Sequence, residues 1–248
     1  MKKYLILLLF ILIPIIIYIL TINNKIYYIA LGDSLAYGQN AYNKNSFGYP
    51  DYIADALRDK LQFYTKDFSV NNYRTTDLIN DINSNKKIKI DNKTLTIKHA
   101  LVEADIVTLS IGTNELFYKL GLNDFDNIYY NENDLKIYVD EVITDIESLI
   151  IIIKKYCKED IIITSFYNPL FHMKKSYAKS IDPIFKYANI RLKEISKKHN
   201  IYYVDINNIL INNSDLLPNP VNIYPSDKGY NIISKQIIEI LDKHIIKK

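Results

Sequence analysis

The stretch IYYIALGDSL, residues 26–35, decides the expected fold. Residues 26–31 form a short continuous apolar run, which is typical of a strand buried on both faces of a parallel sheet. Gly-Asp-Ser follows directly, so Ser34 stands where the strand ends and a turn begins. Because ligands of open α/β sheets bind beyond the carboxyl ends of the strands, we expect Ser34 to face such a site.

Strand-like and helix-like segments alternate through the rest of the chain. The other predicted strands are residues 68–70, 106–111, 161–165 and 201–204. The predicted helices are residues 50–61, 75–82, 135–156, 183–199 and 229–246. Residues 87–90 and 94–97 alternate around Asp91-Asn92 and predict a small hairpin. Five strands joined by helices predict a five-stranded parallel sheet in a three-layer α/β/α domain with right-handed crossovers.

Two asparagines follow predicted strands as Ser34 does. Asn72 comes after the second predicted strand, and Asn114 comes after the third. Because the carboxyl ends of parallel strands meet at one edge of a sheet, we expect these three side chains to share one site.

The composition excludes several classes of function. A formal net charge of +3 is too small to indicate a nucleic-acid partner. The single cysteine, Cys157, excludes an internal disulfide and a cysteine-based metal cluster, and the four histidines show no metal-ligand spacing. Residues 118–133 are rich in Asp, Asn and Tyr but lack the spacing of a calcium-binding loop, so they predict an inserted loop. We expect no metal and no cofactor.

Residues 4–22 predict a membrane anchor. These nineteen residues are apolar apart from Thr21 and the tyrosine hydroxyls, and a helix of this length spans about 28 Å, close to the hydrocarbon thickness of a bilayer. Two lysines precede the run, which predicts that the globular part lies outside the cytoplasm. We therefore expect a single-pass protein of the cell membrane, with an uncleaved anchor in residues 1–25 and an extracytoplasmic domain in residues 26–248.

Two other interpretations of this run remain open. A cleaved signal peptide usually has a shorter apolar region that ends in a small-x-small cleavage site, and residues 21–25 (TINNK) offer no such site. A buried core helix is the other alternative, but the run has no polar face.

Three blocks of the sequence, in this order, resemble the SGNH/GDSL hydrolase family. They are residues 29–38 (IALGDSLAYG), 110–115 (SIGTNE) and 225–230 (PSDKGY). The resemblance covers roughly residues 26–246 and implies the flavodoxin-like SGNH-hydrolase fold. It also implies a serine esterase or lipase for acyl or acetyl esters, whose ligand is a small ester, lipid or glycan.

The resemblance implies a role for each site residue. Ser34 would attack the ester carbonyl, and Asn114 would donate its side-chain amide to the oxyanion. Asn72 stands where the family has an oxyanion glycine. Asparagine tolerates a left-handed backbone, so the N–H of Asn72 could still point into the oxyanion hole. Asp33 and Gly112 lie beside these groups and are predicted to contribute to substrate binding.

The last block departs from the family pattern Asp-x-x-His-Pro. This chain reads VNIYP at residues 221–225, so Val221 and Tyr224 replace the orienting carboxylate and the general base. A phenol with a pKa near 10 is mostly protonated at neutral pH and is no simple substitute for histidine. Tyr224 is therefore predicted to line the substrate site.

Three functional hypotheses remain. The first is a membrane-anchored esterase with impaired catalysis. The second is an inactive pseudoenzyme that binds a lipid, glycan or protein partner at the cell surface. The third is an enzyme with a different acid–base partner, either His172 after the fourth strand or a residue of the loop 118–133. Glu115, Asp205, Asp215 and Asp227 are better explained as capping or solvated charges.

Overall fold

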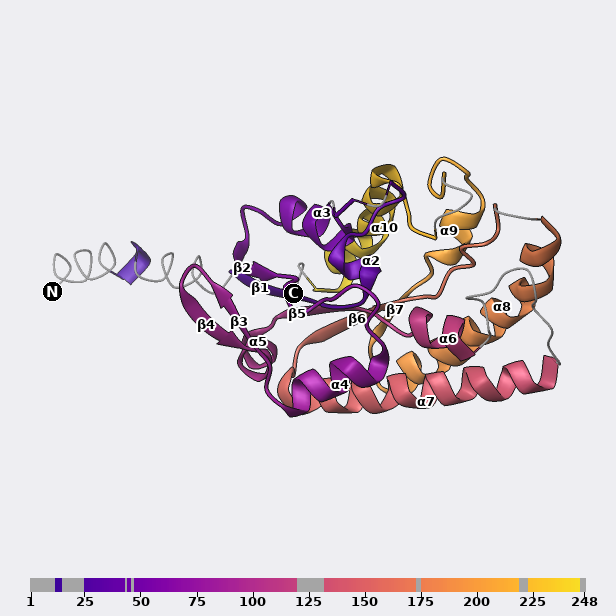
Figure 1. Ribbon diagram of the computed structural model, residues 1–248. Coiled ribbons are helices and arrows are strands. Elements are labelled where there is room, and N and C mark those ends of the chain that lie inside the picture. Colours follow the sequence, from indigo (N-terminus) through magenta and orange to yellow (C-terminus); the bar gives the residue numbers. More distant parts are fainter. Residues whose placement is uncertain are drawn as a thin grey trace, which may run out of the picture.

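The computed structural model describes residues 12–14, 25–42, 44–45, 47–119, 132–172, 175–218 and 223–245. Within them the chain forms a five-stranded sheet with helices on both faces (Figure 1). The strand order is β2-β1-β5-β6-β7, and every pairing in it is parallel. The predicted α/β/α architecture is therefore confirmed, as is the antiparallel hairpin β3-β4.

The elements have the following bounds. The strands of the main sheet are β1 (Ile26–Gly32), β2 (Leu61–Thr65), β5 (Ile106–Ser110), β6 (Asp160–Thr164) and β7 (Tyr202–Val204), and the hairpin is β3 (Lys87–Ile90) with β4 (Lys93–Thr96). The helices are α2 (Ser34–Tyr37), α3 (Tyr49–Ala56), α4 (Thr75–Asn83), α5 (Ile97–Glu103), α6 (Thr113–Lys119), α7 (Glu132–Tyr156), α8 (Lys175–Lys198), α9 (Asn207–Ile211) and α10 (Asp227–Ile240). A π-helical segment, η1 (Leu241–Ile245), extends α10.

Strand β1 supplies side chains to two separate cores. Ile29 and Leu31 pack with residues of α4, α5, α7 and α8 on one face of the sheet. Tyr28 and Ala30 pack with residues of α2, α3 and α10 on the other face. Burial on both faces explains why the strand reads as a continuous apolar run, since each large aliphatic side chain contributes about 1.5–3 kcal/mol when buried.

The second strand differs from the prediction. It spans β2 (Leu61–Thr65), whereas we predicted a helix up to Leu61 and a strand at residues 68–70. As an edge strand, β2 is only partly buried and exposes Gln62, so it lacks the apolar run of an inner strand. Phe68 is fully buried, but it lies in the turn after the strand and packs into the core without pairing.

Helix α8 also differs from the prediction. It begins at Lys175, so Pro183 lies inside the helix and does not start it. The neighbouring Ile181, Ile184 and Phe185 are buried in the core, and this packing holds the helix together across the proline. The short helices α5, α6 and α9 were not predicted.

The predicted anchor lies almost entirely outside the described residues, which include only 12–14 of it. Among the residues that the structure describes, no helix has the length and apolar character needed to cross a membrane. The anchor and the domain boundary at residue 25 therefore stay predictions.

Two glycines near strand ends leave no room for a Cβ atom, one because of backbone atoms and the other because of a side chain. A Cβ on Gly32 would lie 2.0 Å from the carbonyl oxygen of Ser110, and φ at Gly32 is +147°. A Cβ on Gly112, where φ is +98°, would lie 2.7 Å from the flexible Cδ1 of Ile146. We expect Gly112→Ala to lower the free energy of unfolding by about 1–3 kcal/mol. Gly32→Ala should cost more than about 4 kcal/mol, because backbone atoms cannot move aside. Urea denaturation of both variants tests this order, and equal losses would contradict it.

Candidate active site

Ser34 is held by the turn between β1 and α2. The N–H of Asp33 donates to the carbonyl of Ser110 on the neighbouring strand (2.9 Å), so the turn is fixed to β5. The carboxylate of Asp33 then caps α2 by accepting the N–H of Leu35 at 3.1 Å. Ser34 is the first residue of this short helix and is only 3% exposed. The predicted strand-to-helix serine turn is present.

Asn72 contributes a backbone donor to Ser34. Its φ is +63°, the left-handed conformation expected for the position that is glycine in the family. Its N–H donates to the Ser34 hydroxyl oxygen at 3.0 Å, while the side chain is exposed. An oxyanion formed on a carbonyl attacked by Ser34 would lie beside this N–H.

Asn114 lies in the first turn of α6. Its side-chain amide donates one hydrogen bond to the carbonyl of Tyr73 at 2.9 Å, which ties α6 to the loop that carries Asn72. An asparagine amide has two N–H donors, so one remains for a ligand in the pocket that Asn114 lines. The structure thus brings together the three residues that the sequence predicted to meet.

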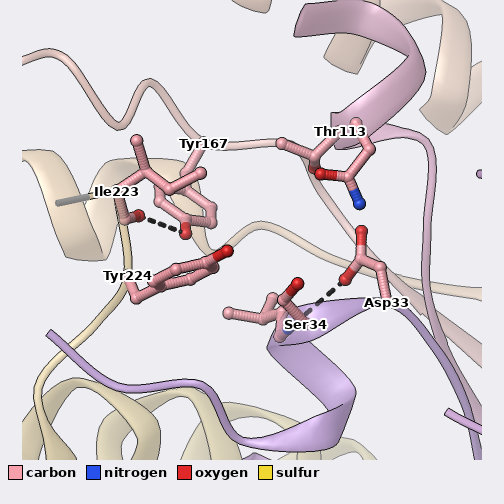
Figure 2. Close-up of a pocket in the computed structure, with 8 residues that line it drawn as sticks. Asp33, Ser34, Thr113, Tyr167, Ile223 and Tyr224 are labelled. Carbon is pink, nitrogen blue, oxygen red and sulfur yellow. Dashed lines mark hydrogen bonds between the residues drawn. The ribbon is translucent and has the colours of Figure 1, made fainter. Parts of the chain in front are cut away.

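A small pocket opens at Ser34. It is lined by Asp33, Ser34, Leu35, Thr113, Asn114, Tyr167, Ile223 and Tyr224. Its volume is about 20 Å³, enough for a water molecule. Figure 2 shows the ring of Tyr224 across the pocket from Asp33, with Ser34 between them. Gly112 is not among the lining residues; its backbone packs closely on Ile146 and Phe166.

Tyr167 is a pocket residue that no sequence motif indicated. It follows β6, so its place at a strand end was the available signal. Its hydroxyl donates to the carbonyl of Ile223 at 2.7 Å and so fixes the segment that carries Tyr224 (Figure 2). Burial raises the pKa of Tyr167 well above its ordinary value, so the phenol stays protonated and keeps this hydrogen bond.

Comparison with known proteins agrees with this geometry. The profile of the GDSL-like lipase/acylhydrolase family matches residues 30–232, which is most of the chain. The chain belongs to this family. No curated protein matches the sequence.

Solved structures share the fold. The lipase Lip_vut3 from a goat rumen metagenome is 16% identical, with a TM-score of 0.66 over 87% of this chain and 97% of the lipase. An extracellular lipase from Streptomyces rimosus is 14% identical, with a TM-score of 0.58 over 84% of this chain and 97% of that one. A catalytic mutant of an acetylxylan esterase from Geobacillus stearothermophilus is 16% identical, with a TM-score of 0.57 over 86% and 92% of the two chains. At these identities the likeness is one of fold.

In this GDSL-family protein, the described residues place no histidine in the pocket. Tyr224 is present there, whereas Val221 lies outside the described residues. His172 contacts the ring of Phe171, His199 pairs with Glu147, and His244 stacks on Tyr202. None of these three lines the pocket at Ser34.

The carboxylates that the sequence predicted to be capping or solvated charges have structural roles. Glu115 is buried and accepts the N–H of Thr75, the first residue of α4, at 3.1 Å. Asp205 accepts the N–H of Asn207 at the start of α9, and Asp215 pairs with Lys228 on the surface. None of these carboxylates lines the pocket.

Asp33 is the one carboxyl group among the pocket residues, and its environment is unusual. It is 4% exposed, and burial raises its pKa from 3.8 to about 7. Hydrogen bonds from the Leu35 N–H and the Ser110 hydroxyl favour the charged form but do not outweigh the loss of solvation. Near neutral pH, Asp33 is therefore divided between its neutral and charged forms.

This pKa predicts a pH dependence of stability. Between pH 4 and 7 the unfolded chain loses the Asp33 proton while the folded protein retains it, so the free energy of unfolding falls as pH rises. A change from 3.8 to about 7 corresponds to a loss of up to about 4 kcal/mol, absent below pH 4 and complete above pH 7. Asp33→Asn keeps the acceptor for the Leu35 N–H and should remove this loss.

Urea denaturation of both proteins at several pH values between 4 and 8 tests the prediction. The difference between the two curves isolates Asp33, because the other groups titrate in both proteins. Asp67→Asn, at an exposed position in the turn after β2, serves as the matched control and should leave the profile unchanged. Parallel profiles for the wild type and Asp33→Asn would mean that Asp33 ionises normally.

Proposed function

We propose that this protein is a membrane-anchored, esterase-like member of the GDSL family that receives acyl or acetyl esters at Ser34 and hydrolyses them at a strongly impaired rate. The observation that carries the proposal is the composition of the pocket. It combines Ser34 and two oxyanion donors with Tyr224 at the position of the family's base.

The retained groups suit the first part of acyl transfer. An ester carbonyl placed over the Ser34 hydroxyl would direct its oxygen to the N–H of Asn72 and the free amide N–H of Asn114. Attack by the hydroxyl forms the tetrahedral oxyanion between these donors, and removing one such donor typically costs about 100- to 1000-fold in rate. Binding and oxyanion stabilisation therefore depend on residues that are present.

The missing part is proton transfer. As the Ser34 oxygen bonds to the carbonyl carbon, its proton must leave, and the alcohol expelled later must receive one. Tyr224 lacks the imidazole nitrogen with which a histidine accepts a proton at neutral pH. In a comparable serine site, loss of the histidine lowers kcat by about 2 × 10⁶, while binding and the oxyanion hole still accelerate the reaction by about 10³–10⁴ over water. We place the protein in this residual range.

Anchoring in the membrane is the second part of the proposal. It is supported by the apolar run of residues 4–22 and the lysines before it. Because Lys25 lies directly before β1, the domain would be held close to the bilayer, outside the cytoplasm.

The second candidate function is ligand binding without turnover. The composition of the pocket supports it, because Ser34 and Asn114 are present while Tyr224 stands at the position of the base that turnover would need. In that case the cleft would serve as a recognition site for a lipid, glycan or protein partner at the cell surface.

Hydrolysis of p-nitrophenyl acetate by the full-length protein in detergent distinguishes these functions. We expect the wild type to be no more than about tenfold faster than Ser34→Ala. Tyr224→His should then raise the rate by up to about 10²-fold, the ratio between losing the histidine and losing only the aspartate of a triad. The double variant Val221→Asp/Tyr224→His should be faster still.

Three outcomes decide the matter. A gain in Tyr224→His that Ser34→Ala or Asn114→Ala removes supports an esterase site that lacks its base. If no variant hydrolyses the ester but the wild type still binds it, the ligand-binding function is supported. Ordinary turnover by the wild type that depends on Ser34 would show that another base exists, and the impaired-catalysis proposal would be wrong.

A further inference from the structure

Charged residues occupy the terminal turns of several helices at both edges of the sheet. Helices that connect parallel strands run against them, so they begin at the carboxyl edge, near Ser34, and end at the amino edge. Acidic residues occupy the first turns of four such helices: Asp51 in α3, Asp77 in α4, Glu115 in α6 and Asp227 in α10. Each one complements the partial positive charge of its helix start.

Basic residues occupy the last turns at the opposite edge. They are Lys154 and Lys155 in α7, Lys197 and Lys198 in α8, and Lys243 and His244 in η1. The stacking of His244 on Tyr202, the first residue of β7, places η1 at the amino edge. Each pair complements the end of its helix. Acidic residues are also present at this edge, because Lys198 pairs with Glu147 at 2.7 Å, Asp105 directly precedes β5 and Asp160 begins β6.

The hairpin β3-β4 concentrates further positive charge. Residues 86–98 contain five lysines and one aspartate, a net charge of +4, whereas the whole chain carries +3. The remaining residues therefore sum to −1. Figure 1 shows the hairpin beside the amino ends of β1 and β2 and far from α2 and α6. The backbone connection agrees, because α5 leads from the hairpin to Asp105, which bonds to Tyr27 at the start of β1.

The hairpin presents its lysines to solvent. Lys87 and Lys89 lie opposite Thr96 and Thr94 on one face, and the other face packs Ile88 on the core. Lys87, Lys89 and Lys93 are exposed, and none forms an ion pair with a residue in the described ranges. Their charge is available for a partner.

The position of the N-terminal run indicates which partner. Lys25, which is exposed, precedes β1 at this same edge, and only Asn23 and Asn24 separate it from the apolar residues 4–22. Three extended residues span at most about 11 Å. A bilayer that held residues 4–22 would therefore lie within reach of this edge, and lysines this close to a membrane surface are attracted by anionic lipid headgroups.

We propose that this basic edge docks on an anionic lipid bilayer and turns the pocket at Ser34 away from it. The basic edge consists of Lys25 and the exposed hairpin residues Lys87, Lys89 and Lys93. The seven residues of β1 separate the edge from Ser34 by about 20 Å. The pocket then receives esters from the aqueous side, such as those of envelope glycans, and not lipids of the bilayer that holds the anchor. The docking rests on the proposed membrane anchoring, but it does not depend on catalysis.

The test uses the full-length protein in vesicles and a fluorescent label attached to Thr94→Cys. Thr94 is exposed on the lysine face of the hairpin, and the native Cys157 is 1% exposed. In phosphatidylcholine vesicles with one quarter phosphatidylglycerol at 10 mM salt, the label should be at least threefold less accessible to acrylamide than in pure phosphatidylcholine. Raising the salt to 1 M shortens the screening length from about 30 Å to about 3 Å and should remove the shielding.

Two sets of lysine variants distinguish an effect of the basic edge from an effect of the protein's overall charge. Changing Lys87, Lys89 and Lys93 to Gln should abolish the shielding. Changing Lys44, Lys186 and Lys235, which are exposed elsewhere, removes the same charge and should leave the shielding intact. A label at Asn208→Cys, exposed at the start of α9 beyond the carboxyl end of β7, should stay accessible in every vesicle.

Several results would overturn the proposal. They are equal accessibility of the Thr94 label in the two kinds of vesicle, equal effects of the two lysine triples, or shielding at Asn208. Shielding of the Thr94 label by soluble heparin but not by phosphatidylglycerol vesicles would assign the basic edge to an acidic polymer, and the membrane proposal would be wrong.

Discussion

The close contact between Gly32 and the backbone of Ser110 determines where Ser34 and the Asn72 N–H lie. Gly32 adopts φ of +147°, which lets β1 turn beside β5 without a side chain between them. Its carbonyl accepts the N–H of Val70, and the next N–H in the chain donates to Ser110. This one turn therefore places Ser34 on α2 and also fixes the loop whose Asn72 N–H reaches the serine hydroxyl. Without it, the Ser34 hydroxyl and the Asn72 N–H would not be aligned.

How far the sequence predicted the structure depended on burial. The inner strands β1 and β5 are covered on both faces, so their apolar runs located them, and the motifs that follow them located Ser34 and Asn114. The edge strand β2 exposes one residue and only partly buries three others, and its signal was lost beside the fully buried Phe68. The family motif located Asn72. Its left-handed backbone could also be predicted, because asparagine adopts this conformation more readily than other non-glycine residues.

Features that depend on packing between distant segments were not predictable in the same way. Tyr167 reaches the carbonyl of Ile223, 56 residues further along the chain, and no spacing rule predicts such a contact. The raised pKa of Asp33 results from burial beneath the pocket, which only the folded structure creates. The sequence predicted where polar groups meet, but their protonation depends on what surrounds them.

That protonation bears on catalysis. At neutral pH the pocket holds Asp33, which is only partly ionised, and Tyr167, whose phenol burial keeps protonated. A site built for general-base catalysis needs an acceptor that is unprotonated and lies next to the nucleophile. The carboxylate of Asp33 already accepts hydrogen bonds from the N–H of Leu35 and the hydroxyl of Ser110. Its charged form therefore caps helix α2 and is not directed at the Ser34 hydroxyl. The described surroundings of Ser34 therefore support the proposal that hydrogen-bond donors for an ester are retained and that removal of the serine proton is the impaired step.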